Sequence, residues 1–139
     1  MQRRLAAQVA LAAAALVLGA LTVSRNQVWA SEVSLWQDAA AKSPRVWAAR
    51  YAAGDALRAA GRCAEAVPEY EAATALVPGE PRAHGNLGIC FAELRRYPEA
   101  AREFERAAEL NPGVAALQRN LGKLAELMGQ PEKAAAHFA

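Results

Sequence analysis

Two histidines, His84 and His137, are the side chains of this sequence best suited to acid–base catalysis or metal binding near neutral pH. Neither has a cysteine, aspartate or glutamate at the spacing of a metal site or a catalytic triad within its own predicted helix. The motif from Gly85 to Gly88 has the G-x-x-G spacing of some phosphate- and RNA-binding loops, but it falls inside a predicted helix, where the backbone N–H groups are already bonded. The sequence therefore predicts no enzyme, no metal site and no cofactor.

The two cysteines, Cys63 and Cys90, are too few for a disulfide scaffold or a self-contained zinc site. They fall in two predicted helices that a stacked helical fold would place side by side, and an oxidising compartment would allow them to form a bond. Free cysteines, however, are common as small buried apolar residues. We therefore expect two unpaired thiols, with a Cys63–Cys90 bond as the alternative.

Hydrophobic residues make up 54% of the 139 residues but aromatic residues only 6%, and much of the difference is alanine. Alanine is the best helix former and is rare in strands, so this composition favours an all-helical protein and excludes a disordered one. The formal net charge of +2 is too small for a typical nucleic-acid-binding protein. We expect no nucleic-acid partner.

An uncharged apolar segment spans residues 5–23, and a helix of that length is about as long as the apolar layer of a bilayer is thick. Arg3 and Arg4 lie in the short region 1–4 before it, so the positive-inside rule places the N-terminus in the cytoplasm. We expect a single-pass anchor in the cell membrane, with the rest of the chain in the periplasm or outside the cell. A signal peptide cleaved near Ala30 is the alternative and leads to the same compartment.

Prolines, glycines, alanines and aromatic residues recur along the chain at one constant interval, the separation of Pro44 from Pro78. The columns are Pro44, Pro78 and Pro112; Gly54, Gly88 and Gly122; Ala39, Ala73 and Ala107; Ala66, Ala100 and Ala134; and the aromatic residues Trp36, Tyr70, Phe104 and Phe138. Such a period is typical of repeats that stack into a solenoid, because one repeat cannot bury its apolar face alone.

Each repeat is predicted to be a pair of helices. In the clearest copy the first helix covers residues 82–94 and the second covers 98–110. Pro98 falls in the first turn of the second helix, where its missing N–H removes no helical hydrogen bond. The period divides the predicted domain into three repeats, over residues 47–80, 81–114 and a truncated 115–139 of the range 45–139.

Upstream of the repeats, the junction of residues 24–44 contains one further predicted helix over 32–42, in register with the second helix of a repeat. Within the repeats, small residues let the helices approach closely and larger ones fill the space between them. These packing residues are Gly54, Ala66, Tyr70, Leu87, Gly88, Phe91, Ala100, Phe104, Leu121 and Gly122. The expected fold is a transmembrane helix followed by an all-α solenoid of about three helical hairpins.

Three elements mark the clearest repeat: Leu87-Gly88-x-x-Phe91, Ala100-x-x-x-Phe104 and Pro112. This pattern resembles the consensus of the tetratricopeptide repeat, and the resemblance covers about residues 47–139. It implies a concave groove, lined by the first helices of the repeats, that binds a protein or peptide. The positions that line such grooves in the family correspond here to Tyr51, Asp55, Arg58, Arg82, Ile89, Glu93, Arg119, Lys123 and Glu126.

A narrower resemblance lies at the junction. The stretch from Thr22 to Pro44 is similar to the segment that joins the last transmembrane helix to the repeats in polytopic membrane glycosyltransferase-like proteins with tetratricopeptide repeats. In that family the repeats face the lumen or the periplasm. The multi-span catalytic domain of the family has no counterpart in this sequence, so the resemblance implies a non-catalytic C-terminal tail.

Two functions follow as expectations. The first is a membrane-anchored, non-enzymatic interaction module exposed outside the cytoplasm, and the alternative is the tail of a membrane protein O-glycosyltransferase-like protein. The sequence also stops within the third repeat, without a polar capping helix. We therefore expect Leu121, Leu124 and Phe138 to be partly exposed and the chain to self-associate at this end.

Overall fold

The structure is a computed structural model that describes residues 13–22 and 31–138. Over residues 31–138 the helices are α2 (Glu32–Lys42), α3 (Trp47–Ala59), α4 (Cys63–Leu76), α5 (Pro81–Glu93), α6 (Tyr97–Leu110), α7 (Ala115–Leu127) and α8 (Pro131–Phe138). Residues 13–22 are also helical. The described residues contain no strand, so the expected all-helical class is confirmed.

Capping residues and prolines mark the first turns of several helices. α2 starts after Ser31, whose hydroxyl accepts the N–H of Ser34 at 3.1 Å, while the Ser34 hydroxyl accepts the N–H of Ser31 at 3.3 Å. α5 and α6 each carry proline in their first turn. The helix expected over 32–42 is α2, and those expected over 82–94 and 98–110 are α5 and α6, with ends that differ by at most one residue.

The same tight turn joins the two helices of every pair. Its central residue has a positive φ, of 72° at Gly61, 59° at Arg95 and 70° at Gly129. In the first turn the N–H of Arg62 donates to the Leu57 carbonyl at 2.9 Å, which closes the end of α3, and the other two turns repeat this bond. Glycine adopts a positive φ without steric cost, whereas Arg95 does so at a cost of about 1–2 kcal/mol.

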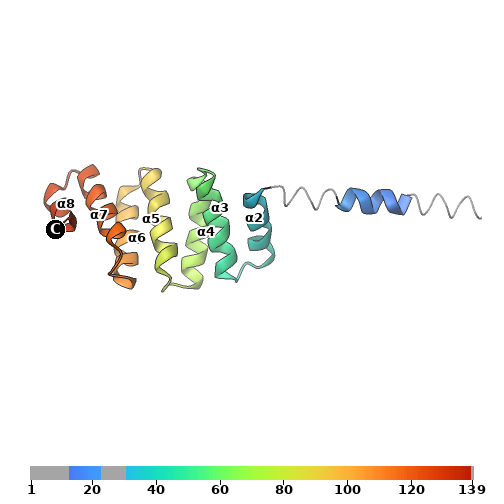
Figure 1. The fold of residues 1–139 in the computed structure, drawn as a ribbon, viewed down its shortest axis with the longest axis horizontal. Coiled ribbons are helices and arrows are strands. Elements are labelled where there is room, and N and C mark those ends of the chain that lie inside the picture. The colour runs from blue at the N-terminus through green and yellow to red at the C-terminus, as the bar shows by residue number, and fades with distance from the viewer. Residues whose placement is uncertain (1–12, 23–30, 139) are drawn as a thin grey trace, which may run out of the picture.

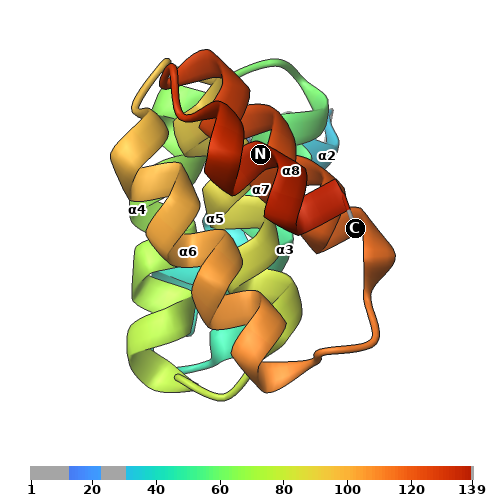
Figure 2. The ribbon, with the colours of Figure 1, turned by 90° about the vertical axis from the view of Figure 1, so that its left-hand side faces the viewer.

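The helices stack in chain order, each against the next, as Figure 1 shows. Figure 2 looks along the stack: α4 and α6 lie on one side, while α3, α5 and α7 follow one another on the other side. The first helices of the pairs therefore share one face of the solenoid, as expected for a repeat array.

Two glycines let the helices of a pair come together. A Cβ at Gly54 would lie 2.8 Å from ring carbons of Tyr70, and one at Gly88 would lie 2.8 Å from ring carbons of Phe104. Both rings are almost fully buried, so they fill the space that a larger residue would need. This contact explains why glycine and an aromatic residue recur together, and all ten residues predicted to pack the helices are buried.

The expectation that Leu121 and Leu124 are partly exposed is wrong. Their exposed fractions are 5% and 3%, because both belong to the main core and α8 packs against α7. The leucine that stays exposed at this end is Leu127, at 54%. The side chain of Phe138 lies outside what the structure describes.

Of the predicted membrane segment, residues 5–23, the structure describes only residues 13–22. Among the described residues, no helix combines the length and the apolar composition needed to cross a bilayer. The predicted region 1–4 and the junction residues before Ser31 also lie outside the described residues.

Candidate functional site: the groove of α3, α5 and α7

The nine predicted groove residues are distributed over three helices. They are Tyr51, Asp55 and Arg58 on α3, Arg82, Ile89 and Glu93 on α5, and Arg119, Lys123 and Glu126 on α7. The structure joins the three residues of α3 to one hydrogen-bonded network, and it places Ile89, Glu93 and Lys123 around a hollow between α5 and α7.

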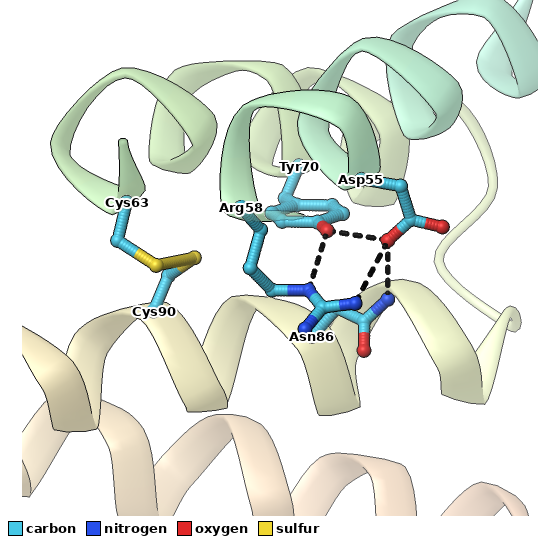
Figure 3. The surroundings of a disulfide bond; sticks show 6 residues. All are labelled: Asp55, Arg58, Cys63, Tyr70, Asn86 and Cys90. Carbon is cyan, nitrogen blue, oxygen red and sulfur yellow. Dashed lines mark hydrogen bonds and ion pairs between the residues drawn. A yellow bond between two sulfur atoms is a disulfide. The ribbon is translucent and has the colours of Figure 1, made fainter. Parts of the chain in front are cut away.

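The network connects α3, α4 and α5 (Figure 3). The carboxylate of Asp55 accepts the Tyr70 hydroxyl at 2.6 Å and a side-chain N–H of Asn86 at 2.7 Å. Arg58 Nε donates to the Tyr70 hydroxyl at 3.3 Å, and the Asn86 amide also donates to the Tyr51 hydroxyl at 3.1 Å. Both N–H groups of Asn86 are thereby used. These side-chain hydrogen bonds join α3 to α5.

Burial sets the protonation of the two tyrosines in this network. Burial is the main cause that raises the pKa of Tyr70 well above its ordinary value, and the hydrogen bond to Asp55 acts in the same direction. Burial also raises the pKa of Tyr51, with the charge of Asp55 as the next cause. Both hydroxyls thus stay protonated at neutral pH. The guanidinium of Arg82 lies 5.6 Å from the centre of the Tyr51 ring, within cation–π distance.

Two adjoining hollows, with volumes of about 300 Å³ and 360 Å³, open between α5 and α7, and Tyr51 of α3 also lines the second one. Ile89, Phe104 and Asn120 border both of them, so the two form one depression, which we call the α5–α7 hollow. Most of its lining is apolar. Glu93 and Lys123 lie near the C-terminal ends of α5 and α7, and Arg82 lies near the N-terminal end of α5.

Some residues of this site differ from those expected. Arg119 and Glu126 are exposed on α7 and line neither part of the hollow. Phe104, expected to act in packing alone, also lines the hollow, and so does Asn120. The constant interval of the repeats could have identified Asn120 from the sequence, because it lies one repeat after Asn86. A role of the nine residues in binding stays a prediction.

Cys63 and Cys90 form a disulfide, so the expectation of two unpaired thiols is wrong. Cys63 begins α4 and Cys90 lies within α5, and their Cα atoms are 5.0 Å apart. The bond lies near the network of Asp55 and Tyr70 in Figure 3. It joins two consecutive repeats, because the stacking of α4 on α5 brings together residues 27 positions apart.

The two histidines take part in a contact that every repeat contains. The contact joins the first and second helices of a pair through residues 19 positions apart: Arg50–Glu69 at 2.8 Å, His84–Glu103 at 2.7 Å and Gln118–His137 at 3.0 Å. His84 is held further by the Pro78 carbonyl, 3.1 Å from its Nε2 atom. Within the part of the chain that the structure describes, no group of three His, Cys, Asp or Glu side chains is placed to hold a metal ion.

Comparison with known proteins gives a family and a fold. A family model described as tetratricopeptide repeat matches residues 33–81, 51–113 and 91–139. One similar solved structure is MamA 41-end from Desulfovibrio magneticus RS-1, with 24% identity and a TM-score of 0.72 over 76% of this chain and 60% of that one. A crystal structure of MamA aligns with 19% identity and a TM-score of 0.74 over 76% of this chain and 62% of that one. Among curated proteins none matches.

At these identities the likeness to the solved structures shows the fold. The chain covers less than two thirds of either of them. The three matches of the family model, in contrast, overlap from residue 33 to residue 139 and so include all of α3 to α8 and nearly all of α2.

Proposed function

The chain belongs to the tetratricopeptide repeat family, and we propose that it is a non-enzymatic module that binds a segment of another protein in the groove of α3, α5 and α7. The observation that carries the proposal is the α5–α7 hollow, which is open, mostly apolar and bordered by a few polar side chains. Pockets of this composition bind apolar groups and use the polar side chains to orient them. The network of Asp55 and Tyr70 supports the proposal, because it braces α3 and α4 against α5.

The proposal also includes a location. We place the repeats in the periplasm or outside the cell, with residues 5–23 as a single-pass anchor in the cell membrane. The apolar composition of that segment and the arginines Arg3 and Arg4 before it support this orientation. The Cys63–Cys90 disulfide is independent support, because structural disulfides are common in exported proteins and rare in the cytosol.

Site-specific photocrosslinking in cells tests the binding proposal. A photoreactive residue at Ile89, on the inner face of the groove, is expected to crosslink a discrete partner protein. A matched control at Glu71, which is exposed on α4, is expected to give no such product. Absence of any protein product from Ile89, or the same product from both positions, would show that the groove is not the binding surface.

A second candidate function rests on the residues from Thr22 to Pro44, which resemble the junction of membrane glycosyltransferase-like proteins. In that case the chain is an accessory tail that acts only together with a multi-span catalytic protein. Purification of the full-length chain from membranes separates the two candidates. A multi-span glycosyltransferase that co-purifies in constant ratio supports the tail, whereas a crosslinked partner of another class supports an independent module.

A further inference from the structure

A further hollow, of about 250 Å³, opens between the second helices α6 and α8, with α7 beneath it, and we call it the α6–α8 hollow. The apolar part of its lining consists of Pro98, Ala101, Leu121, Ala125 and Met128. The polar part consists of Arg102, Glu105, Gln130, Lys133 and His137. None of these ten residues lines the α5–α7 hollow, so the two hollows are separate places on the molecule.

The preceding repeat has larger side chains at the positions that correspond to this hollow. Val67 stands one repeat before Ala101, and Phe91 stands one repeat before Ala125. Both larger side chains belong to the main core, with exposed fractions of 7% and 4%. When a ring and a branched side chain are replaced by methyl groups, the space that they filled is left open unless the helices move together. The two alanines therefore account for the hollow.

The charge of the lining also changes from one repeat to the next. Lys133 stands one repeat after Glu99, and Arg102 stands one repeat after Pro68. Among the described residues, neither Lys133 nor Arg102 has a carboxylate within ion-pair distance. Glu105 is the one acidic residue of the lining, so the two permanent cations leave an excess of positive charge. An anionic group is the partner that this excess favours.

The chain itself shows which apolar group suits such a place. In the preceding repeat the guanidinium of Arg96 lies 4.4 Å from the centre of the Phe91 ring, which is a cation–π contact. The α6–α8 hollow has the cations but lacks the ring, because Ala125 stands where Phe91 would be. An aromatic ring that enters from outside would lie on Ala125 and restore the arrangement of the preceding repeat.

We propose that the α6–α8 hollow is a second binding site, which takes an aromatic side chain of a partner protein together with a carboxylate next to it. The ring lies on Ala125, and the carboxylate lies between Arg102 and Lys133. A volume of about 250 Å³ is below the range of pockets for free small molecules. Single aromatic side chains seated in pockets are, in contrast, frequent anchors of protein–protein contacts. This inference goes beyond the proposed function, because the hollow lies outside the groove of α3, α5 and α7.

Differential selection from a random heptapeptide display library tests the proposal. The library is first selected on the immobilised full-length chain. It is then depleted on the double variant Ala101→Val/Ala125→Phe, which carries the side chains of the preceding repeat and so fills the hollow. Peptides that bind in the groove bind both proteins and are removed by the depletion. The peptides that remain are expected to share an aromatic residue next to an aspartate or a glutamate.

A charge reversal examines the carboxylate separately, with fluorescence anisotropy of a selected peptide. Lys133→Glu gives the hollow the acid that the preceding repeat has at Glu99 and is expected to weaken binding about fivefold, the effect of one exposed ion pair. The same peptide with lysine in place of its acidic residue is expected to prefer this variant to the original chain. The matched control is Arg45→Glu, an equal change of charge at an exposed residue between α2 and α3, which is expected to leave binding unchanged. Circular dichroism confirms that each variant keeps its helices.

The proposal is overturned if no peptide survives the depletion, or if the surviving peptides lack either the aromatic or the acidic residue. It is also overturned if Lys133→Glu weakens binding no more than Arg45→Glu does. This last comparison decides the matter even if the double variant does not fold, because it can be made with every peptide selected on the original chain. Photocrosslinking from Ile89 reports on the groove alone, so the proposed function and this second site can fail independently.

Discussion

The substitution Gly88→Ala offers the sharpest test of how the helices of a repeat pack. A new Cβ would lie 2.8 Å from two ring carbons of Phe104 and 3.2 Å from a third. The ring is almost fully buried, so it moves aside only by disturbing its neighbours. Overpacking of this kind costs about 1–3 kcal/mol. The replacement of a helical glycine by alanine contributes about 1 kcal/mol in the opposite direction.

Three contacts below 3.4 Å place Gly88→Ala near the upper end of that cost, so we expect the free energy of unfolding to fall by about 2 kcal/mol. Gly85→Ala, one turn earlier on α5, is the matched control. Its Cβ would meet only Leu117, at 3.8 Å, an ordinary contact. This variant is expected to be more stable than the original chain by up to about 1 kcal/mol. Urea unfolding followed by circular dichroism measures both values.

Two results would refute this reasoning. If Gly88→Ala and Gly85→Ala change stability by the same amount, the Phe104 ring is free to move into the α5–α7 hollow, which it borders. If Gly88→Ala is destabilising but the further change Phe104→Leu makes the loss larger, the clash with the ring is not its cause. We expect Phe104→Leu to restore part of the stability lost in Gly88→Ala, although on its own it leaves a cavity and destabilises.

Three further predictions concern the disulfide, a turn and a buried hydroxyl. The Cys63–Cys90 bond joins residues 27 positions apart, and its reduction is expected to lower the free energy of unfolding by about 3.5 kcal/mol in urea titrations. In the control variant Cys63→Ala/Cys90→Ala, the reductant is expected to have no effect. Arg95→Gly is expected to raise the melting temperature, since it relieves about 1 kcal/mol at the positive φ of 59°; no change would mean that the strain is absent. Because the pKa of Tyr70 is raised in the folded chain, its contribution to stability is complete below about pH 10 and decreases as the pH rises further. Ultraviolet absorbance should detect its ionisation only together with alkaline unfolding, and ionisation of every tyrosine in the folded state would contradict the burial argument.

The first helices of consecutive pairs are joined differently along the groove. The network of Asp55 and Asn86 stiffens α3 against α5, whereas α5 and α7 are separated by the hollow.

The helices and their spacing were predictable because their signals are local. Pro98 belongs in the first turn of a helix, and Gly54 and Gly88 recur with aromatic residues at a constant interval. The turn after residue 94 was predicted, but the positive φ of Arg95 was not, because the glycine of the other two turns is replaced there by a residue that rarely adopts such a φ. The contact of His84 with Glu103 was also missed, since reasoning within one helix cannot relate residues on two.

The sequence by itself determined the all-helical class, the period and the repeat family, because each depends on short-range preferences repeated along the chain. Only the tertiary structure decided that Cys63 meets Cys90, that Leu121 is buried, and that Asn86 and Asn120 differ in their partners. These outcomes depend on the distances between helices, and those distances are set by the packing of all the side chains between them. Asn86 bonds to Tyr51 and Asp55, whereas one repeat later Asn120 lines a hollow together with Gly85 and Ile89.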